Sequence, residues 1–243
     1  MKTIIAVFVM FLAVFGVNSQ DFKPVVTGQD VIDNYITASG GKDALKDIES
    51  IRMKGKIGEG SEAGELEIYF SKNYVYMDIG MKEFSMKQAI DVKKKKGWTK
   101  FGEMIKDMTE EEIKKNTKNM DGSMWGNFIN PEEFGITYEL LQNETIDGTE
   151  YYAVDLVRDS LTVSTSYFDM KTFDKVREIK GGMTSGFSDF RKVKDSDVIM
   201  PYKITSQTGD VVITDITFNS SFNTKLLKRP KDKKGDDSKN EDK

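Results

Sequence analysis

The sequence contains no cysteine and no histidine, and these absences exclude several classes of protein before any motif is considered. Without cysteine, the chain can form no disulfide and can carry no lipid anchor on a cysteine, so its stability has to come from packing. Without histidine, it lacks the commonest general base and the commonest metal ligand. Histidine-dependent serine and cysteine hydrolases and histidine-ligated zinc sites are therefore excluded.

Long apolar runs are also missing after the amino terminus. The run from Ile4 to Val17 follows a single cation, Lys2, and is shorter than the roughly 20 residues that span a bilayer. This pattern is typical of a secretory signal peptide, and the small side chains of Val17 and Ser19 suit cleavage before Gln20. We therefore expect residues 1–19 to be a cleaved signal peptide and the mature protein to be soluble.

An excess of positive charge is missing as well. The chain has 36 Lys and Arg against 40 Asp and Glu, a net charge of −4, which argues against a nucleic-acid partner. The basic residues concentrate in Lys93–Lys96 and in the tail "KLLKRPKDKKGDDSKNEDK". Since the tail has no large apolar side chain after Leu227, residues 230–243 are predicted to be disordered.

The spacing of apolar residues changes along the chain from the period of helices to that of strands. "TGQDVIDNYITASGG" has a helix-capping spacing from Thr27 to Asp30 and ends at two glycines, which predicts a short amphipathic helix, and "KDALKDI" adds about two turns. From residue 51, "IRMKGKI", "ELEIYF", "NYVYMDI" and "EFSMKQAID" alternate as half-buried strands do. After Pro131 the same period returns in about six further segments. Runs of strands joined by short turns favour one large antiparallel sheet with helices on its apolar face.

A helical insert separates the two runs of strands. Thr109 and Glu112 have the spacing of a capping box, and Met108 and Ile113 flank it as a hydrophobic staple. The insert lies within a cluster of methionine and aromatic residues, namely Trp98, Phe101, Met104, Met108, Met120, Met124, Trp125 and Phe128. Such a cluster is either ordinary core under a helix or, because methionine adapts to ligands of varied shape, a lid over an apolar cavity.

Two charged features also have alternative explanations. Lys93–Lys96 can be a solvated hairpin tip or a site that attracts anionic headgroups. The carboxylate pairs at Glu132 with Glu133, and at Asp195 with Asp197, lie in no recognisable catalytic or calcium-binding pattern and are expected to be exposed turn residues.

Several segments together resemble a known family. "ALKDIESIRMKGKI" resembles the opening of the LolA/LolB-like lipoprotein-carrier superfamily, in which a helix precedes a strand of the form "I..I...G..". "GTEYYAVDLV" and "SYFDMKTFDKVREI" are similar to its central hairpin, "DFRKVKDSDVIMPYKI" to its "D...VDG...P..I" segment, and "ITFNSSFNTKLLKRP" to its closing segment. The resemblance covers residues 28 to 230, nearly all of the mature chain.

The resemblance implies an α+β fold that is mainly β. The expected architecture is a curved, incompletely closed antiparallel barrel of about 10–11 strands, formed by residues 20–229, with helices on its concave face and an apolar cavity for acyl chains. Residues 108 to 124 would then be a lid helix over the mouth of the barrel. LolA-type carriers have an Arg-Pro pair where this chain has Lys72 and Asn73, so Lys72 is the candidate for the latch, although lysine lacks the planar fork of arginine.

The function expected from these observations is that of a monomeric, non-catalytic periplasmic carrier in a Gram-negative bacterium. It would hold a lipid or an acylated protein without a cofactor or a metal. The residues expected to line the cavity and lid are Met53, Leu66, Ile68, Phe70, Met86, Trp98, Met108, Ile113, Met120 and Met124. One alternative is an envelope sensor or assembly factor that binds a protein partner through the same fold. Another is an enzyme working with carboxylates or a Ser/Lys pair, for which no activated nucleophile is visible.

Overall fold

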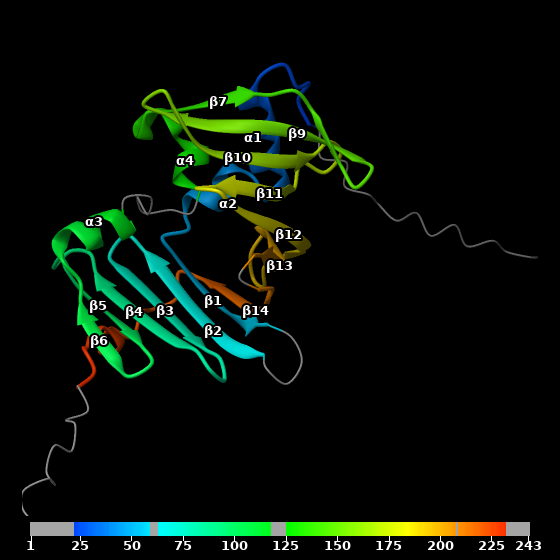
Figure 1. Cartoon of the computed structure of the whole chain (residues 1–243). Helices are drawn as coiled ribbons and strands as arrows, with labels where there is room; N and C mark the ends of the chain where they lie inside the picture. The colour runs from blue at the N-terminus through cyan, green and yellow to red at the C-terminus, as the bar shows by residue number, and fades with distance from the viewer. Residues whose placement is uncertain (1–21, 59–62, 118–124, 208, 232–243) are drawn as a thin grey trace, which may run out of the picture.

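The computed structural model describes residues 22–58, 63–117, 125–207 and 209–231. The predicted signal peptide, residues 1–19, lies outside the described residues, as do Met120, Met124 and most of the predicted disordered tail. Over the part that is described, fourteen strands form one antiparallel sheet in the order β6-β5-β4-β3-β2-β1-β14-β13-β12-β11-β10-β9-β7, with β8 paired to β9 (Figure 1).

The strands join into this order through short turns. They are β1 (Ser50–Ile57), β2 (Gly64–Ser71), β3 (Tyr74–Gly80), β4 (Ser85–Asp91), β5 (Lys96–Phe101), β6 (Met104–Asp107), β7 (Ile136–Leu140), β8 (Glu144–Ile146), β9 (Thr149–Arg158), β10 (Leu161–Asp169), β11 (Lys175–Lys180), β12 (Met183–Lys192), β13 (Ile199–Ser206) and β14 (Val211–Phe218). The helices are α1 (Gly28–Ala38), α2 (Lys42–Lys46), α3 (Glu110–Thr117) and α4 (Gly126–Ile129), with short 3₁₀ turns η2 (Pro131–Phe134) and η3 (Thr224–Leu227).

The sheet is curved and open, as the sequence predicted, and it has more strands than the ten or eleven expected. Its two ends, β6 and β7, do not pair with each other. The additional strands include short ones: β6 folds back from β5 at Gly102, which has a positive φ of 53°, and β8 has only three residues. Figure 1 shows β1–β6 as one side of the molecule, here called the amino-terminal wing, and β7 with β9–β12 as the other, the carboxy-terminal wing.

Helix α1 begins where the sequence predicted. Thr27 and Asp30 form a capping box, in which the Asp30 backbone N–H donates to Thr27 Oγ1 and the Thr27 backbone N–H donates to Asp30 Oδ2. At the start of the helix, a Cβ on Gly28 would lie 2.6 Å from the backbone oxygen of Tyr138 in β7. Only glycine therefore allows α1 to lie this close to the edge of the sheet.

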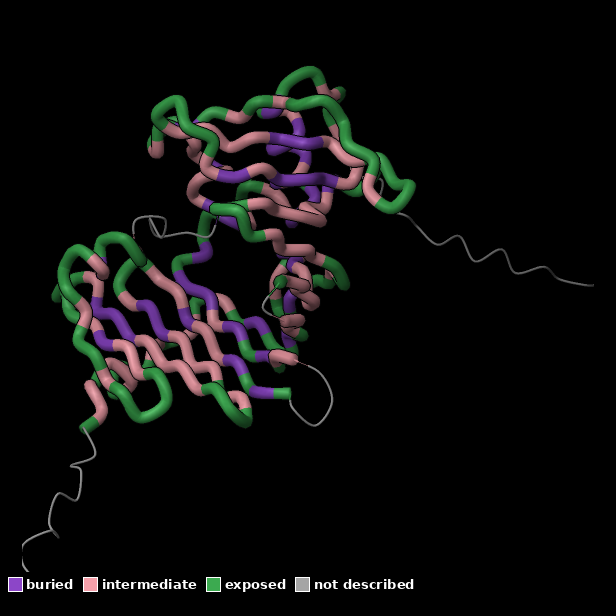
Figure 2. Tube along the Cα trace, viewed as in Figure 1, coloured by how far each residue is buried: buried purple, intermediate pink, exposed green. Residues whose placement is uncertain are grey.

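The main core lies between helices α1, α2 and α4 and the inner face of the sheet. Val31 and Ile32 of α1, Leu45 of α2 and Phe168 of β10 are all almost completely buried there. Figure 2 shows how burial runs along the inner strands and fades at the hairpin tips. The helices therefore cover the inner face mainly over the carboxy-terminal wing, as their contacts with β7 and β9 also show.

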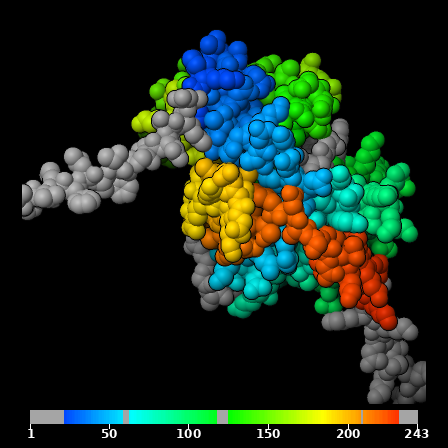
Figure 3. Space-filling view, turned by 180° about the vertical axis from the view of Figure 1, so that it is seen from behind, coloured from blue at the N-terminus to red at the C-terminus, as the bar shows by residue number. Residues whose placement is uncertain are grey.

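The outer face of the amino-terminal wing is covered by the segment Asn219–Arg229, here called the C-terminal strap. Phe222 of the strap packs against Tyr69 and stacks on Tyr74, with ring centroids 4.6 Å and 5.0 Å away. Trp98 Nε1 donates a hydrogen bond to the backbone oxygen of Leu227 at 2.9 Å. Figure 3 shows the strap across this outer face, coloured orange to red.

Candidate functional site

Alternation along the strands of the amino-terminal wing places three rows of mainly apolar side chains on the inner face. Because side chains opposite each other in an antiparallel pair share a face, the register of the strands defines each row. The first, here called the open row, contains Leu66, Ile79, Met86, Phe101 and Met104. The second, the middle row, contains Met53, Ile68, Met77, Gln88 and Thr99. The third, the covered row, contains Ile51, Phe70, Val75, Ile90 and Gly97.

Exposure rises along the open row toward the edge of the sheet. Leu66 is only 6% exposed, whereas Phe101 is 45% and Met104 is 68% exposed. Phe84, in the turn before β4, is also exposed, and its ring centroid lies 6.5 Å from that of Phe101. The far end of the row is therefore an apolar surface in contact with solvent.

Helix α3 covers the other end of the same face. Ile113, which is 3% exposed, packs against Val75 and Ile90 of the covered row, together with Met108. The capping box predicted for this helix is confirmed: the Glu112 backbone N–H donates to Thr109 Oγ1, and the Thr109 backbone N–H donates to Glu112 Oε2. Residues 118–124 of the predicted lid lie outside the described residues, so α3 is the only helix of the predicted lid that the structure describes.

The Glu112 carboxylate is held in its charged form. Lys106 Nζ lies 2.7 Å from Glu112 Oε1, and this contact, with the hydrogen bond from the Thr109 backbone, lowers the pKa of Glu112 from 4.5 to about 2. A carboxylate whose pKa is depressed in the folded state stabilises that state at pH values above its unfolded pKa. This contribution is lost as the pH falls from about 4.5 toward 2.

We expect the start of α3 to loosen in acid through Glu112. In an NMR titration, the amide shift of Thr109 should follow a transition with a midpoint near pH 2. Glu112→Gln keeps a side chain that can accept the Thr109 hydrogen bond but has no charge to titrate, so in this variant the transition should disappear. A midpoint near the ordinary glutamate value in the unmodified protein would show that the Lys106 and Thr109 contacts do not hold the charge.

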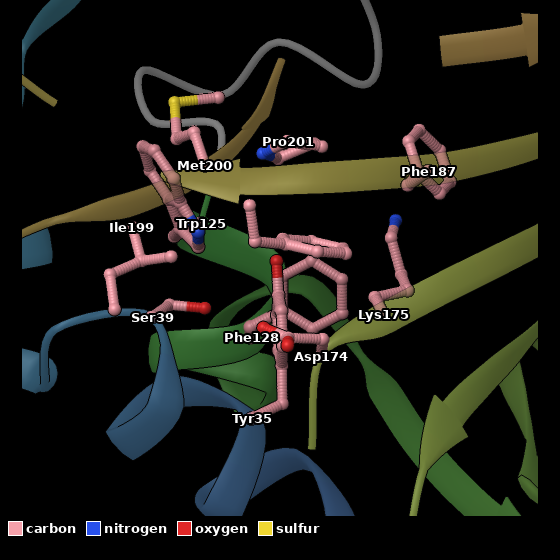
Figure 4. A pocket seen from close by; sticks show the side chains of 11 residues that line it. Tyr35, Ser39, Trp125, Phe128, Asp174, Lys175, Phe187, Ile199, Met200 and Pro201 are labelled. Atoms are coloured by element: carbon pink, nitrogen blue, oxygen red, sulfur yellow. The ribbon is translucent and has the colours of Figure 1, made fainter. Parts of the chain in front are cut away.

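A small cavity lies between the helices and the carboxy-terminal wing. It has a volume of about 120 Å³ and is lined by aromatic side chains that include Tyr35 of α1, Phe128 of α4 and Phe187 of β12 (Figure 4). Lys175 of β11 reaches into it, with Nζ 5.7 Å from the ring centroid of Phe128 and 5.0 Å from that of Phe187. The amine thus interacts with two aromatic rings and also lies 3.5 Å from a carboxylate oxygen of Glu178.

The size of this cavity limits what it can hold. Pockets that enclose a drug-sized ligand have volumes of roughly 300–1,000 Å³, and this one has about 120 Å³. Tyr35 also contacts Phe128 edge to face, with ring centroids 5.3 Å apart, so the helices close tightly over it. The cavity can take the end of a chain or a small group, whereas the open row exposes Phe101 and Met104 directly to solvent.

The structure brings most of the predicted site residues onto one face. Seven of the described predicted residues lie on the inner face of the amino-terminal wing or pack on it from α3 and the turn before it: Met53, Leu66, Ile68, Phe70, Met86, Met108 and Ile113. Met53 in β1 lies beside Ile68 on the same face. Lys72, the latch candidate, is exposed in the turn before β3, 4.0 Å from Glu49.

Trp98 is placed elsewhere, which corrects its assignment to the cavity wall. It pairs with Ala89 and lies on the outer face with Tyr69 and Tyr76, under the C-terminal strap. The physical reason is strand alternation: Gly97, Thr99 and Phe101 take the inner positions of β5, so Trp98 must point outward.

Other residues of the site were not predicted. Met77 and Ile79 follow the same strand alternation as Ile68 and Phe70, so the sequence pattern could have identified them. The cavity residues Tyr35, Lys175 and Phe187 come from elements far apart in the chain, and no local pattern joins them.

The described ranges contain neither a metal-binding cluster nor a membrane-spanning helix. No group of three or more acidic side chains within them is placed to hold a metal ion. No described helix has the length and apolar character needed to cross a membrane.

Comparisons with known proteins give similarities of fold. No protein-family model matches the sequence, and no curated protein matches it. A crystal structure of a DUF1329 family protein from Desulfovibrio piger is 9% identical, with a TM-score of 0.48, over 83% of this chain and 97% of that one. A LolA superfamily protein from Nitrosomonas europaea is 12% identical, with a TM-score of 0.46, over 84% and 99% of the two chains. A putative outer membrane lipoprotein-sorting protein domain from Vibrio parahaemolyticus is 11% identical, with a TM-score of 0.43, over 82% and 95%.

Proposed function

We propose that the protein is a non-catalytic periplasmic carrier that holds a lipid, or the acyl chain of a lipoprotein, against the inner face of its amino-terminal wing. The observation that carries the proposal is the open row, which runs from buried Leu66 to the exposed side chains of Phe101 and Met104. An apolar surface that begins inside the core and continues into solvent suits a chain that enters from one end.

The chemistry of this face supports an acyl chain rather than a polar ligand. Its inner positions are mainly aliphatic, aromatic or methionine side chains, and methionine adapts to chains of varied shape. The polar positions of the middle row, Gln88 and Thr99, lie toward the edge of the sheet, where the polar end of a cargo would meet water. Each buried methylene contributes about 0.8 kcal/mol, so about ten of them would offset the several kcal/mol that association costs.

The proposed cargo path also has an element that can close it. Helix α3 has only eight residues and packs on this face through Ile113. Its few apolar contacts make it the element of this face that opens at the lowest free energy. A cargo would then lie between α3 and the open row, and the small cavity beside Lys175 would take the end of a chain.

Native mass spectrometry tests the proposal. The protein is expressed with its amino-terminal segment, purified from the periplasm without detergent, and measured under native and denaturing conditions. We expect a co-purifying lipid or acylated peptide that is lost on denaturation. A clean apo mass, together with no uptake of a fluorescent fatty acid, would overturn the carrier proposal and favour a protein partner.

A further inference from the structure

A groove with a basic rim lies on the outer face of the amino-terminal wing, on the side opposite the proposed cargo surface. It has a volume of about 680 Å³ and runs between the β4–β5 turn and the C-terminal strap. Five cationic side chains line it, here called the basic groove: Lys94, Lys95, Lys96, Lys228 and Arg229. Residues separated by more than a hundred positions in the sequence are thus brought to one place.

The carboxylates near this groove are fewer than the cations, and they are already paired. Asp91 lies 3.0 Å from Lys94, Asp107 lies 2.9 Å from Arg229, and Glu110 of α3 lies 3.3 Å from Lys95. Across the described residues, no carboxylate lies within ion-pair distance of Lys96 or Lys228. The groove therefore keeps a net positive charge on a chain whose overall charge is −4.

The cations are held in position by the fold. The Lys94 backbone N–H donates to Asp91 Oδ1 at 3.0 Å, and Lys95 has a positive φ of 51°, so the β4–β5 turn has a defined shape. On the other side, the hydrogen bond from Trp98 to Leu227 fixes the strap immediately before Lys228. The two basic segments are therefore arranged before any partner binds, which lowers the entropic cost of binding.

We propose that the basic groove docks the protein on anionic phospholipid headgroups at a bilayer surface. Lys93–Lys96 are all exposed rather than converging on one buried point, as a site for a single small anion would require. An array of exposed cations suits a surface that carries many phosphates, because each lysine near an anionic membrane adds to the attraction and salt screens it. This docking goes beyond the proposed function, since a carrier can hold a cargo without touching a membrane.

Vesicle flotation with a charge-reversed variant tests the proposal. Lys96→Glu with Lys228→Glu changes the two cations of the groove that have no carboxylate partner, so no ion pair is broken. The control, Lys171→Glu with Lys180→Glu, makes the same change in net charge at two exposed positions of the carboxy-terminal wing, one in the turn before β11 and one at the end of that strand. At low salt, we expect the unmodified protein and the control to float with phosphatidylglycerol-containing vesicles and not with pure phosphatidylcholine. The groove variant should bind at least about tenfold more weakly.

Three outcomes would overturn the docking proposal. The first is equal binding of the protein to both kinds of vesicle. The second is an equal loss of vesicle binding in the groove variant and in the control. The third is release of the protein from vesicles by millimolar inorganic phosphate at constant ionic strength, which would assign the groove to a soluble anion. Failure of the docking proposal can be distinguished from failure of the carrier proposal. The native mass of the groove variant reports whether it still holds a cargo, whatever its binding to vesicles.

Discussion

Phe101→Glu should abolish the uptake of a fluorescent fatty acid while leaving the fold intact. Phe101 belongs to the open row and is 45% exposed, so a glutamate there can remain hydrated in the free protein and should cost little stability. A bound acyl chain would cover that carboxylate, and removing an unpaired charge from water costs several kcal/mol. We expect the Kd measured by fluorescence titration to rise at least about 100-fold.

The matched control for this prediction is Leu161→Glu. Leu161 begins β10 in the carboxy-terminal wing and is 69% exposed, so the substitution adds the same charge at another exposed apolar position. Uptake by this variant should equal that of the unmodified protein. Unchanged uptake in Phe101→Glu, or an equal loss in both variants, would remove the inner face of the amino-terminal wing from the proposed site.

Strand alternation explains why the sequence located much of this face. In β2, the apolar positions Leu66, Ile68 and Phe70 alternate with Glu65, Glu67 and Tyr69, and the observed register puts the three apolar residues on the inner face together. The charged residues mark the outer face in that strand, so both faces could be assigned from the local pattern.

The same pattern failed at Trp98 because β5 does not follow it. Its inner positions begin with Gly97 and Thr99, and its largest apolar side chain points outward. A Cβ on Gly97 would lie only 3.1 Å from Met108 Sδ, so the sulfur occupies the space that a larger inner residue would need. The pairing of Gly97 with Met108 joins β5 to the start of α3, and a contact of this kind is visible only once the chain has folded.

The C-terminal strap shows a second limit of local patterns. The sequence up to Leu227 contains Phe222, Leu226 and Leu227, but their period indicates neither a helix nor a strand. In the structure they cover Tyr69, Tyr76 and Trp98, which would otherwise be exposed on the outer face. The strap is stabilised by tertiary contacts, so its position depends on side chains that lie over a hundred residues earlier in the chain.

Truncation after Asn219 should therefore destabilise the amino-terminal wing strongly. It removes the rings and leucines that cover the outer cluster, the hydrogen bond from Tyr69 Oη to the backbone oxygen of Ser220, and the one from Trp98 to Leu227. Burial of one large apolar side chain contributes about 1.5–3 kcal/mol and each hydrogen bond about 1 kcal/mol. We expect the free energy of unfolding, measured in urea, to fall by at least about 4 kcal/mol, a large share of the 5–15 kcal/mol typical of folded proteins.

Truncation after Lys231 is the control for length, since it removes only residues 232–243 and leaves the strap in place. Its free energy of unfolding should equal that of the protein without the truncation. Phe222→Ala should lie between the two, about 2 kcal/mol below the unmodified protein, because it deletes only the half-buried ring that contacts Tyr69 and Tyr74. If truncation after Asn219 left the unfolding midpoint unchanged, the strap would not stabilise the wing. The two sides of the basic groove would then be free to separate, and the groove would have no fixed shape with which to meet a membrane.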